Sequence, residues 1–218
     1  MRLIAATRIA STAAAAVLVA GCVTSGPPRL SEDRLKSSAV LIESSLCDGA
    51  ASGSGFFISA TELVTNRHVV AATTGVRVQT ADGRTLTVGE ILLSRRIDAA
   101  VLRLTEAAGR PLLLGADPAP GDAAWIVGYP QGGPVRVTTG RVVDEIDGSR
   151  FHQPGTLIRT RAEADPGNSG GPLLNSRGEV MGLVTAVEYD SGWTLAIPVS
   201  DLAQALPKMD TAPPAAQC

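Results

Sequence analysis

The segment Asp165–Leu173 holds the residue types that acyl-transfer chemistry needs. Its run Gly-Asn-Ser-Gly-Gly-Pro disfavours a regular helix or strand, because glycine and proline break both. The run predicts a turn on which Ser169 presents its hydroxyl while backbone N–H groups point into the same concavity. A nucleophile beside donors for a developing oxyanion is what acyl transfer requires. The alternative is a plain surface loop rich in glycine, proline and serine.

A serine hydroxyl is a weak nucleophile without a base, and the chain has only two histidines that could serve. His152 lies in a polar segment that indicates an exposed loop, so it is interpreted as a solvated side chain. His68 follows an apolar strand and is the candidate base, or else a satisfied core histidine. Asp98 begins another apolar strand, where a carboxylate is costly without a partner. It is the candidate for orienting the base, or else a strand-edge carboxylate that faces water.

The elements around these residues are predicted to be short strands separated by turn residues, from about residue 38 onward. Asp82-Gly83 lies between two alternating runs and predicts a tight hairpin, because glycine supplies the positive φ that such turns need. Many short strands indicate an all-β barrel or sandwich and not βαβ units. The strand candidates are 76–80, 85–88, 99–104, 123–127, 135–143, 156–160 and 180–187.

One short helix is expected near the C-terminus, with Ser200 as its N-cap and Asp201 in its first turn. Its apolar face is expected to consist of Leu202, Ala203 and Leu206. The folded domain is therefore predicted over 38–206, and residues 207–218 are expected to form a flexible tail.

Composition excludes several classes of protein. The 218 residues are 44% hydrophobic and 18% charged, which excludes wholesale disorder. The net charge of −2 without a basic stripe, and only seven aromatic residues, exclude nucleic acid as a partner. Two histidines and three cysteines show no metal-ligand spacing, so no metal site is expected. The glycines at 53 and 55 are too few for a dinucleotide-binding loop and no helix follows them, so no cofactor is expected.

The N-terminus is expected to be a targeting segment. Arg2 and Arg8 precede a mostly apolar stretch over 9–20, which is too short to span a membrane but fits a signal peptide over 1–21. The run ending at Cys22 resembles a bacterial lipobox, which implies cleavage before Cys22 and lipidation of its thiol. The alternative is an ordinary signal peptide that contains a cysteine. Residues 22–37 are expected to be a lipidated tether, which implies a membrane-anchored lipoprotein facing the periplasm, on the outer membrane rather than the inner.

Three motifs together resemble the trypsin-like serine proteases. The segment TNRHVV around His68, DAAVLRL beginning at Asp98 and GNSGGPL around Ser169 occur in that family's order. Asn168 and the later segments GLVTA and AIP resemble the HtrA/Deg-like bacterial branch. The resemblance covers about 38–206 and implies two antiparallel six-stranded β-barrels with the site in the cleft between them. HtrA proteins usually carry a PDZ domain after the protease domain, and the 12 residues after Leu206 are too few to supply one.

The resemblance also implies a role for each matching residue. Ser169 would attack the scissile carbonyl, His68 would accept and later return its proton, and Asp98 would orient and stabilise the imidazole. The backbone N–H groups of Gly167 and Ser169 would form the oxyanion hole. The substrate backbone would pair with Thr185, Ala186 and Val187.

Specificity and cross-linking stay open at this point. Glu163 either faces the primary specificity pocket and favours a basic side chain, or points to solvent. A pocket lined by Ala186 and Leu195 would instead prefer small or medium apolar side chains. Cys47 and Cys218 are the thiols left after lipidation. They either pair within the chain in an oxidising compartment, stay free, or pair between molecules through Cys218.

The function expected from these features is a lipid-anchored serine endopeptidase that acts on proteins or peptides of the cell envelope. The alternative of a different class is a catalytically latent protease-fold module that binds a partner at the membrane, since a fold alone does not establish activity. An esterase that uses the same three residues would differ only in its leaving group. The sequence does not define the oligomeric state.

Overall fold

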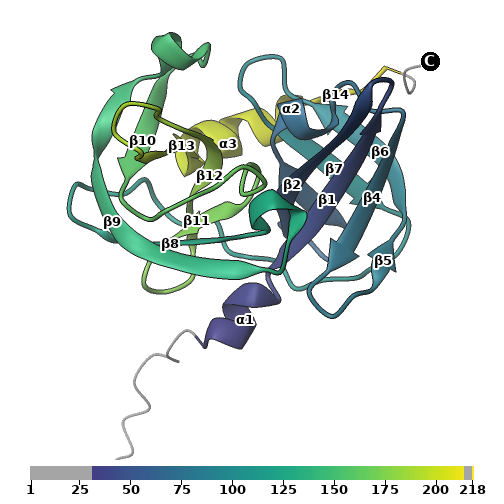
Figure 1. The fold of residues 1–218 in the computed structure, drawn as a ribbon, viewed down its shortest axis with the longest axis horizontal. Coiled ribbons are helices and arrows are strands. Elements are labelled where there is room, and N and C mark those ends of the chain that lie inside the picture. The colour runs from purple at the N-terminus through teal and green to yellow at the C-terminus, as the bar shows by residue number, and fades with distance from the viewer. Residues whose placement is uncertain (1–30, 214–217) are drawn as a thin grey trace, which may run out of the picture.

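The computed structural model describes residues 31–213 and 218. The predicted signal peptide over 1–21, Cys22 and the tether up to residue 30 lie outside the described residues. Figure 1 shows two β-units side by side. Within the described part of the chain, no helix is long and apolar enough to cross a membrane.

The first unit is an eight-stranded antiparallel sheet with the order β14-β6-β7-β3-β2-β1-β4-β5. Its two end strands, β5 and β14, have two residues each, so six longer strands form its body. The bounds are β1 (Ala39–Leu46), β2 (Gly49–Phe57), β3 (Glu62–Thr65), β4 (Gly75–Thr80), β5 (Thr85–Leu86), β6 (Val88–Leu93), β7 (Ala100–Leu104) and β14 (Asp210–Thr211).

The second unit is a closed barrel of six strands in the order β10-β13-β12-β11-β8-β9. The expected all-β fold is confirmed: a closed six-stranded barrel is joined to a second sheet, with short helices at the edges. The bounds are β8 (Ala123–Gly128), β9 (Arg136–Asp147), β10 (Thr156–Thr160), β11 (Pro172–Leu174), β12 (Val180–Val187) and β13 (Thr194–Pro198). The helical segments are α1 (Glu32–Lys36), α2 (Arg67–Val70), η1 (Pro130–Gly132), η2 (Gly148–Phe151), α3 (Val199–Ala205) and η3 (Leu206–Lys208).

The hairpin expected at Asp82-Gly83 joins β4 to β5, and Gly83 has a φ of 84°. The buried residues form three apolar clusters. One cluster lies within each unit, and the third contains side chains of both, including Phe56 of the first unit and Leu183 of the second. Burial of this shared apolar surface stabilises the contact between the two units.

The C-terminal helix differs from the expectation in its boundaries. It begins after Pro198, and Ser200 lies inside it and not at its N-cap. The carboxylate of Asp117 accepts the Ser200 N–H at 3.0 Å, so a distant acid satisfies this helix start. The buried face consists of Val199, Leu202 and Ala205, while Ala203 is exposed.

The segments on either side of the domain also differ from the expectation. Residues 32–36 of the expected tether form α1, with the Ser31 side chain as its N-cap. The expected flexible tail over 207–218 contains η3 and β14, which pairs with β6. Cys47 and Cys218 form a disulfide with 5.4 Å between their Cα atoms. The end of the chain is therefore tied to the turn between β1 and β2.

Candidate active site

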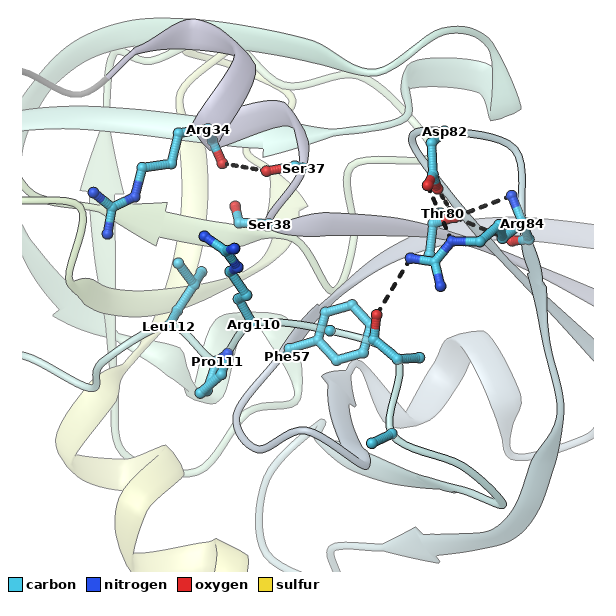
Figure 2. Close-up of a pocket in the computed structure, with 13 residues that line it drawn as sticks. Arg34, Ser37, Ser38, Phe57, Thr80, Asp82, Arg84, Arg110, Pro111 and Leu112 are labelled. Atoms are coloured by element: carbon cyan, nitrogen blue, oxygen red, sulfur yellow. Dashed lines mark hydrogen bonds and ion pairs between the residues drawn. The ribbon is translucent and has the colours of Figure 1, made fainter.

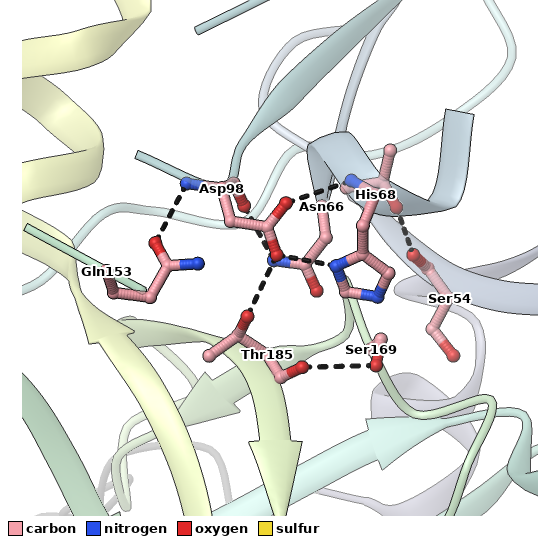
Figure 3. Close-up of polar contacts among 8 residues, drawn as sticks. Ser54, Asn66, His68, Asp98, Gln153, Ser169 and Thr185 are labelled. Carbon is pink, nitrogen blue, oxygen red and sulfur yellow. Dashed lines mark hydrogen bonds and ion pairs between the residues drawn. The ribbon is translucent and has the colours of Figure 1, made fainter. Parts of the chain in front are cut away.

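His68 and Asp98 are brought together by the pairing of β3 with β7, which places Thr65 opposite Ala100. His68 follows β3 on the short helix α2, and Asp98 lies just before β7. Asp98 accepts the His68 backbone N–H with Oδ1 at 2.9 Å, and its Oδ2 lies 2.5 Å from His68 Nδ1. Two contacts to one carboxylate fix the imidazole orientation and leave Nε2 directed toward Ser169 (Figure 3).

The Asp98 carboxylate is held in its ionised form. Its side chain is only 11% exposed, and it accepts a further hydrogen bond from Thr185 Oγ1 at 3.0 Å. Burial raises the pKa of this carboxyl, but the hydrogen bonds from His68 and Thr185 lower it by more, so the pKa lies below the ordinary aspartate value. A buried anion beside Nδ1 favours the tautomer that carries its proton there and stabilises an imidazolium.

Two further side chains fix the backbone of Asp98. Asn66 Nδ2 donates to the Asp98 carbonyl at 2.7 Å, and the Asp98 N–H donates to Gln153 Oε1 at 3.1 Å. Figure 3 shows Gln153 reaching this position from the second unit. Sequence reasoning missed both residues. Asn66 has a local signal, because it lies two residues before His68, but nothing near Gln153 indicates a contact with Asp98.

Ser169 lies in the loop between β10 and β11, and this loop is pinned to β12 by the Gly170 N–H, which donates to the Val184 carbonyl at 2.8 Å. The Ser169 hydroxyl donates to the Thr185 carbonyl at 3.3 Å. Within the described residues it forms no hydrogen bond with His68. The structure therefore brings the nucleophile candidate beside the base but leaves the bond between them unmade, which is common in sites without substrate.

Two backbone N–H groups beside Ser169 have no hydrogen-bond acceptor among the described residues. Gly167 has a φ of 100°, which favours glycine. The Asn168 N–H is used within the turn, donating to the Asp165 carbonyl at 3.0 Å. In contrast, the N–H groups of Gly167 and Ser169 donate to no acceptor among the described residues. Two unpaired donors on alternate residues are what a developing oxyanion would use.

Ser54 of β2 connects the first unit to this loop, and the sequence reasoning gave it no role. Its hydroxyl donates to the Gly167 carbonyl at 2.7 Å and accepts the Tyr129 N–H at 2.9 Å. Its backbone N–H donates to the Ser169 carbonyl at 2.7 Å. The Ser54 side chain is fully buried. The signal available was the segment Gly-Ser-Gly-Phe, whose glycines permit close approach of another backbone.

An apolar pocket of about 330 Å³ adjoins Ser169 and includes Val184, Ala186 and Val187 of β12. Ala186 lines it as expected, whereas Leu195 does not line it and is fully buried in the apolar cluster shared by the two units. Glu163 is exposed and does not line this pocket. Of the two orientations expected for its side chain, the structure therefore has the one toward solvent. The pocket therefore fits a small or medium apolar side chain, and β12 beside it runs from the buried Thr185 to the exposed Val187.

Other candidate positions lie apart from these groups. His152 is exposed, as expected, and follows η2 in a left-handed conformation with a φ of 57°. Residues 31–213 and 218 contain no group of histidine, cysteine and acidic side chains that could hold a metal ion. A hollow of about 520 Å³ lies between α1 and the β4–β5 hairpin, with Arg34, Arg84 and Arg110 among the residues that line it (Figure 2). It contains none of the three candidate catalytic residues.

Comparisons with known proteins show which family has this arrangement. Residues 53–183 match the model of the trypsin-like peptidase domain. The chain is 37% identical over 157 residues to the putative serine protease HhoB of Synechocystis, covering 67% of this chain and 37% of that protein. It is 32% identical over 156 residues to the serine protease Rv3671c of Mycobacterium tuberculosis, covering 68% and 39%. The chain thus spans about two fifths of the length of these relatives.

Solved structures show the same fold. The active form of the Rv3671c protease superposes with a TM-score of 0.73 at 28% identity, covering 84% of this chain and 86% of that chain. The HtrA-type protease AlgW with a tripeptide superposes with a TM-score of 0.72 at 25% identity, covering 80% and 60%. With the domain match over 131 residues of the 218, these likenesses show that the chain belongs to the trypsin-like serine peptidase family, in its HtrA-type branch.

Proposed function

We propose that this chain is a serine endopeptidase in which Ser169, His68 and Asp98 act as a catalytic triad. The observation that carries the proposal is the Asp98 carboxylate, which lies 2.5 Å from His68 Nδ1 and directs Nε2 toward the Ser169 hydroxyl. Rotation of the Ser169 side chain from the Thr185 carbonyl toward Nε2 completes the arrangement when a peptide binds.

Acylation follows from these positions. Ser169 Oγ attacks the carbonyl carbon of the peptide bond while His68 Nε2 takes the hydroxyl proton, and Asp98 stabilises the resulting imidazolium. The oxyanion is bound by the N–H groups of Gly167 and Ser169. The C–N bond then breaks, His68 returns the proton to the leaving amine, and the acyl group stays on Ser169.

Deacylation follows the same steps with water as the attacking group in place of Ser169. His68 takes a proton from the water molecule that attacks the acyl carbonyl, and the proton returns to Ser169 Oγ as the C–O bond breaks. The apolar pocket beside Ser169 supports a preference for a small or medium apolar side chain at P1, the residue before the cleaved bond. Protein or peptide substrates follow from the family to which the chain belongs.

The test is labelling of the full chain in detergent with a fluorophosphonate probe, which reacts with activated serines. Wild type is expected to be labelled, and Ser169→Ala and His68→Ala are expected to lose the label. Both variants must retain the wild-type circular dichroism spectrum. A folded wild type without label contradicts the proposal.

A specific observation supports the alternative of a latent binding module: the Ser169 hydroxyl bonds to Thr185 and not to His68. The two functions differ in the outcome of the labelling experiment. A latent module stays unlabelled but still binds peptides in the cleft. Its affinity for these peptides would be the same in Ser169→Ala as in wild type.

We also infer that the chain is a membrane-anchored lipoprotein of the bacterial envelope that faces the periplasm. The support is the lipobox-like run before Cys22 after a short apolar stretch. Each acyl chain contributes about 0.8 kcal/mol per buried CH₂, so two or three acyl chains on Cys22 would anchor the protein stably. Metabolic labelling with radioactive palmitate tests this: wild type should carry label and Cys22→Ser should not, and an unlabelled mature wild type contradicts it.

A further inference from the structure

A hollow of about 350 Å³ with a basic rim adjoins His68 and Asp98. Arg67 of α2, and Arg95 and Arg96 of the β6–β7 connection, line it together with His152 from the loop after η2. We call Arg67, Arg95, Arg96 and His152 the basic rim. Arg67, Arg95 and Arg96 are exposed, so their charges can meet a molecule in the cleft.

The positive charge of the basic rim is only partly neutralised. Arg95 pairs with Asp210 of β14 at 2.7 Å. Arg67 donates to the Ser94 carbonyl at 3.3 Å, which carries no net charge, and Arg96 forms no ion pair among the described residues. The one carboxylate in the hollow is that of Asp98, which is bound by His68 and Thr185. Two guanidinium groups therefore stand beside the candidate triad without an anionic partner in the described part of the chain.

The path of a peptide through the cleft brings some of its side chains toward this rim. An extended peptide that pairs antiparallel with Thr185–Val187 has P1 in the apolar pocket of the second unit. Successive side chains of a strand point to opposite faces. The side chains at P2 and P4, the second and fourth residues upstream of the cleaved bond, then point away from that pocket and toward the first unit, where His68 and the three arginines of the basic rim lie.

We propose that the basic rim is a specificity subsite for an acidic side chain, aspartate or glutamate, at P2 or P4 of the substrate. The proposal rests on the proposed endopeptidase function. Arg96 is the central determinant, because it has no ion-pair partner among the described residues and lies two residues before Asp98. One solvent-exposed ion pair corresponds to a preference of about two- to fivefold.

The test uses fluorogenic peptides with valine at P1 that differ only at P2 or only at P4, with aspartate, asparagine or lysine. For the full-length wild type in detergent, kcat/KM is expected to be about two- to fivefold higher with aspartate than with asparagine at one of these positions, and lowest with lysine. Arg96→Glu is expected to reverse the order of aspartate and lysine. Arg77→Glu makes the same charge change at a half-exposed arginine of β4 and should keep the wild-type order.

A second measurement does not depend on turnover. Fluorescence anisotropy gives the affinity of Ser169→Ala for the same peptides, and the aspartate peptide should bind more tightly, with the difference shrinking as salt screens the charges. Equal cleavage and equal binding of all three peptides overturn the subsite while leaving the endopeptidase intact. A folded wild type that neither cleaves nor takes the fluorophosphonate label contradicts the endopeptidase function, and the anisotropy order then decides on the basic rim alone.

Discussion

Asp98 is the residue on which the largest number of site contacts converge. Its carboxylate accepts from His68 and Thr185, its carbonyl accepts from Asn66, and its N–H donates to Gln153. Because the hydrogen bonds from His68 and Thr185 favour the charged carboxylate by more than burial disfavours it, the pKa of Asp98 in the folded state lies below that in the unfolded chain. The free energy of unfolding must therefore depend on pH through this residue.

The expected outcome is a pH-dependent difference between wild type and Asp98→Asn. A depressed pKa stabilises the fold above the unfolded value, which is about 3.9, and this contribution disappears as the pH falls through the folded value. Urea unfolding of both proteins from pH 7 down to pH 2.5 should give a larger free energy of unfolding for wild type at neutral pH. This difference in free energy should shrink below about pH 4. Asp190→Asn, on an exposed turn, controls for the loss of a carboxyl elsewhere. A difference that grows as the pH falls would refute this assignment.

At the same scale, the sequence predicted the residues that have local motifs and missed those placed by long-range contacts. His68, Asp98 and Ser169 each lie in a short segment whose composition indicates chemistry. Ser54 and Gln153 do not, because Ser54 acts on a residue 113 positions away and Gln153 on one 55 positions away. Only the pairing of the two units places them at the site.

Among the elements, strands were predicted where residue alternation and turn glycines are strong, as in β4, β5 and β8. The start of α3 was predicted wrongly, since the group that satisfies it, Asp117, lies 83 residues away from Ser200. Residues 207–218 were expected to form a flexible tail. Asp210 and Thr211 instead pair with β6, and Cys218 is bonded to Cys47; neither contact leaves a local pattern in the sequence.

The disulfide between the β1–β2 turn and the C-terminus is expected to contribute about 2–4 kcal/mol to the free energy of unfolding, because it constrains a long loop of the unfolded chain. Cys47→Ser should therefore lower the urea midpoint. Reduction with dithiothreitol should lower the urea midpoint of wild type by the same amount and should leave the midpoint of Cys47→Ser unchanged. An unchanged midpoint in both cases would show that the bond does not stabilise the fold.

For the whole molecule, the site exists only where the two units meet. Ser54 joins them at the loop that carries Ser169. Removal of its hydroxyl leaves the buried Gly167 carbonyl and the Tyr129 N–H without this partner. Ser54→Ala is expected to cost about 1–3 kcal/mol of stability. It should also lower kcat by about tenfold or more, since the loss of an oxyanion donor costs up to 10²–10³-fold.

The matched control is Ser38→Ala, which removes a buried serine hydroxyl that donates to the Leu35 carbonyl at 2.6 Å, away from the site. It should lower stability without changing kcat. Measuring both kinetic constants with a P1-valine peptide distinguishes the roles. If Ser54→Ala and Ser38→Ala change stability alike and neither changes kcat, Ser54 has no positioning role.

The bond between Cys47 and Cys218 also makes a covalent ring of the chain from residue 47 to its end, a separation of 171 positions. A single backbone cut inside this ring, whether by the enzyme on itself or by another protease, yields two pieces that stay attached. The two β-units that form the site lie almost wholly within this ring. A nicked molecule would thus run as one band on a non-reducing gel and as two after reduction, and it would keep both halves of its cleft.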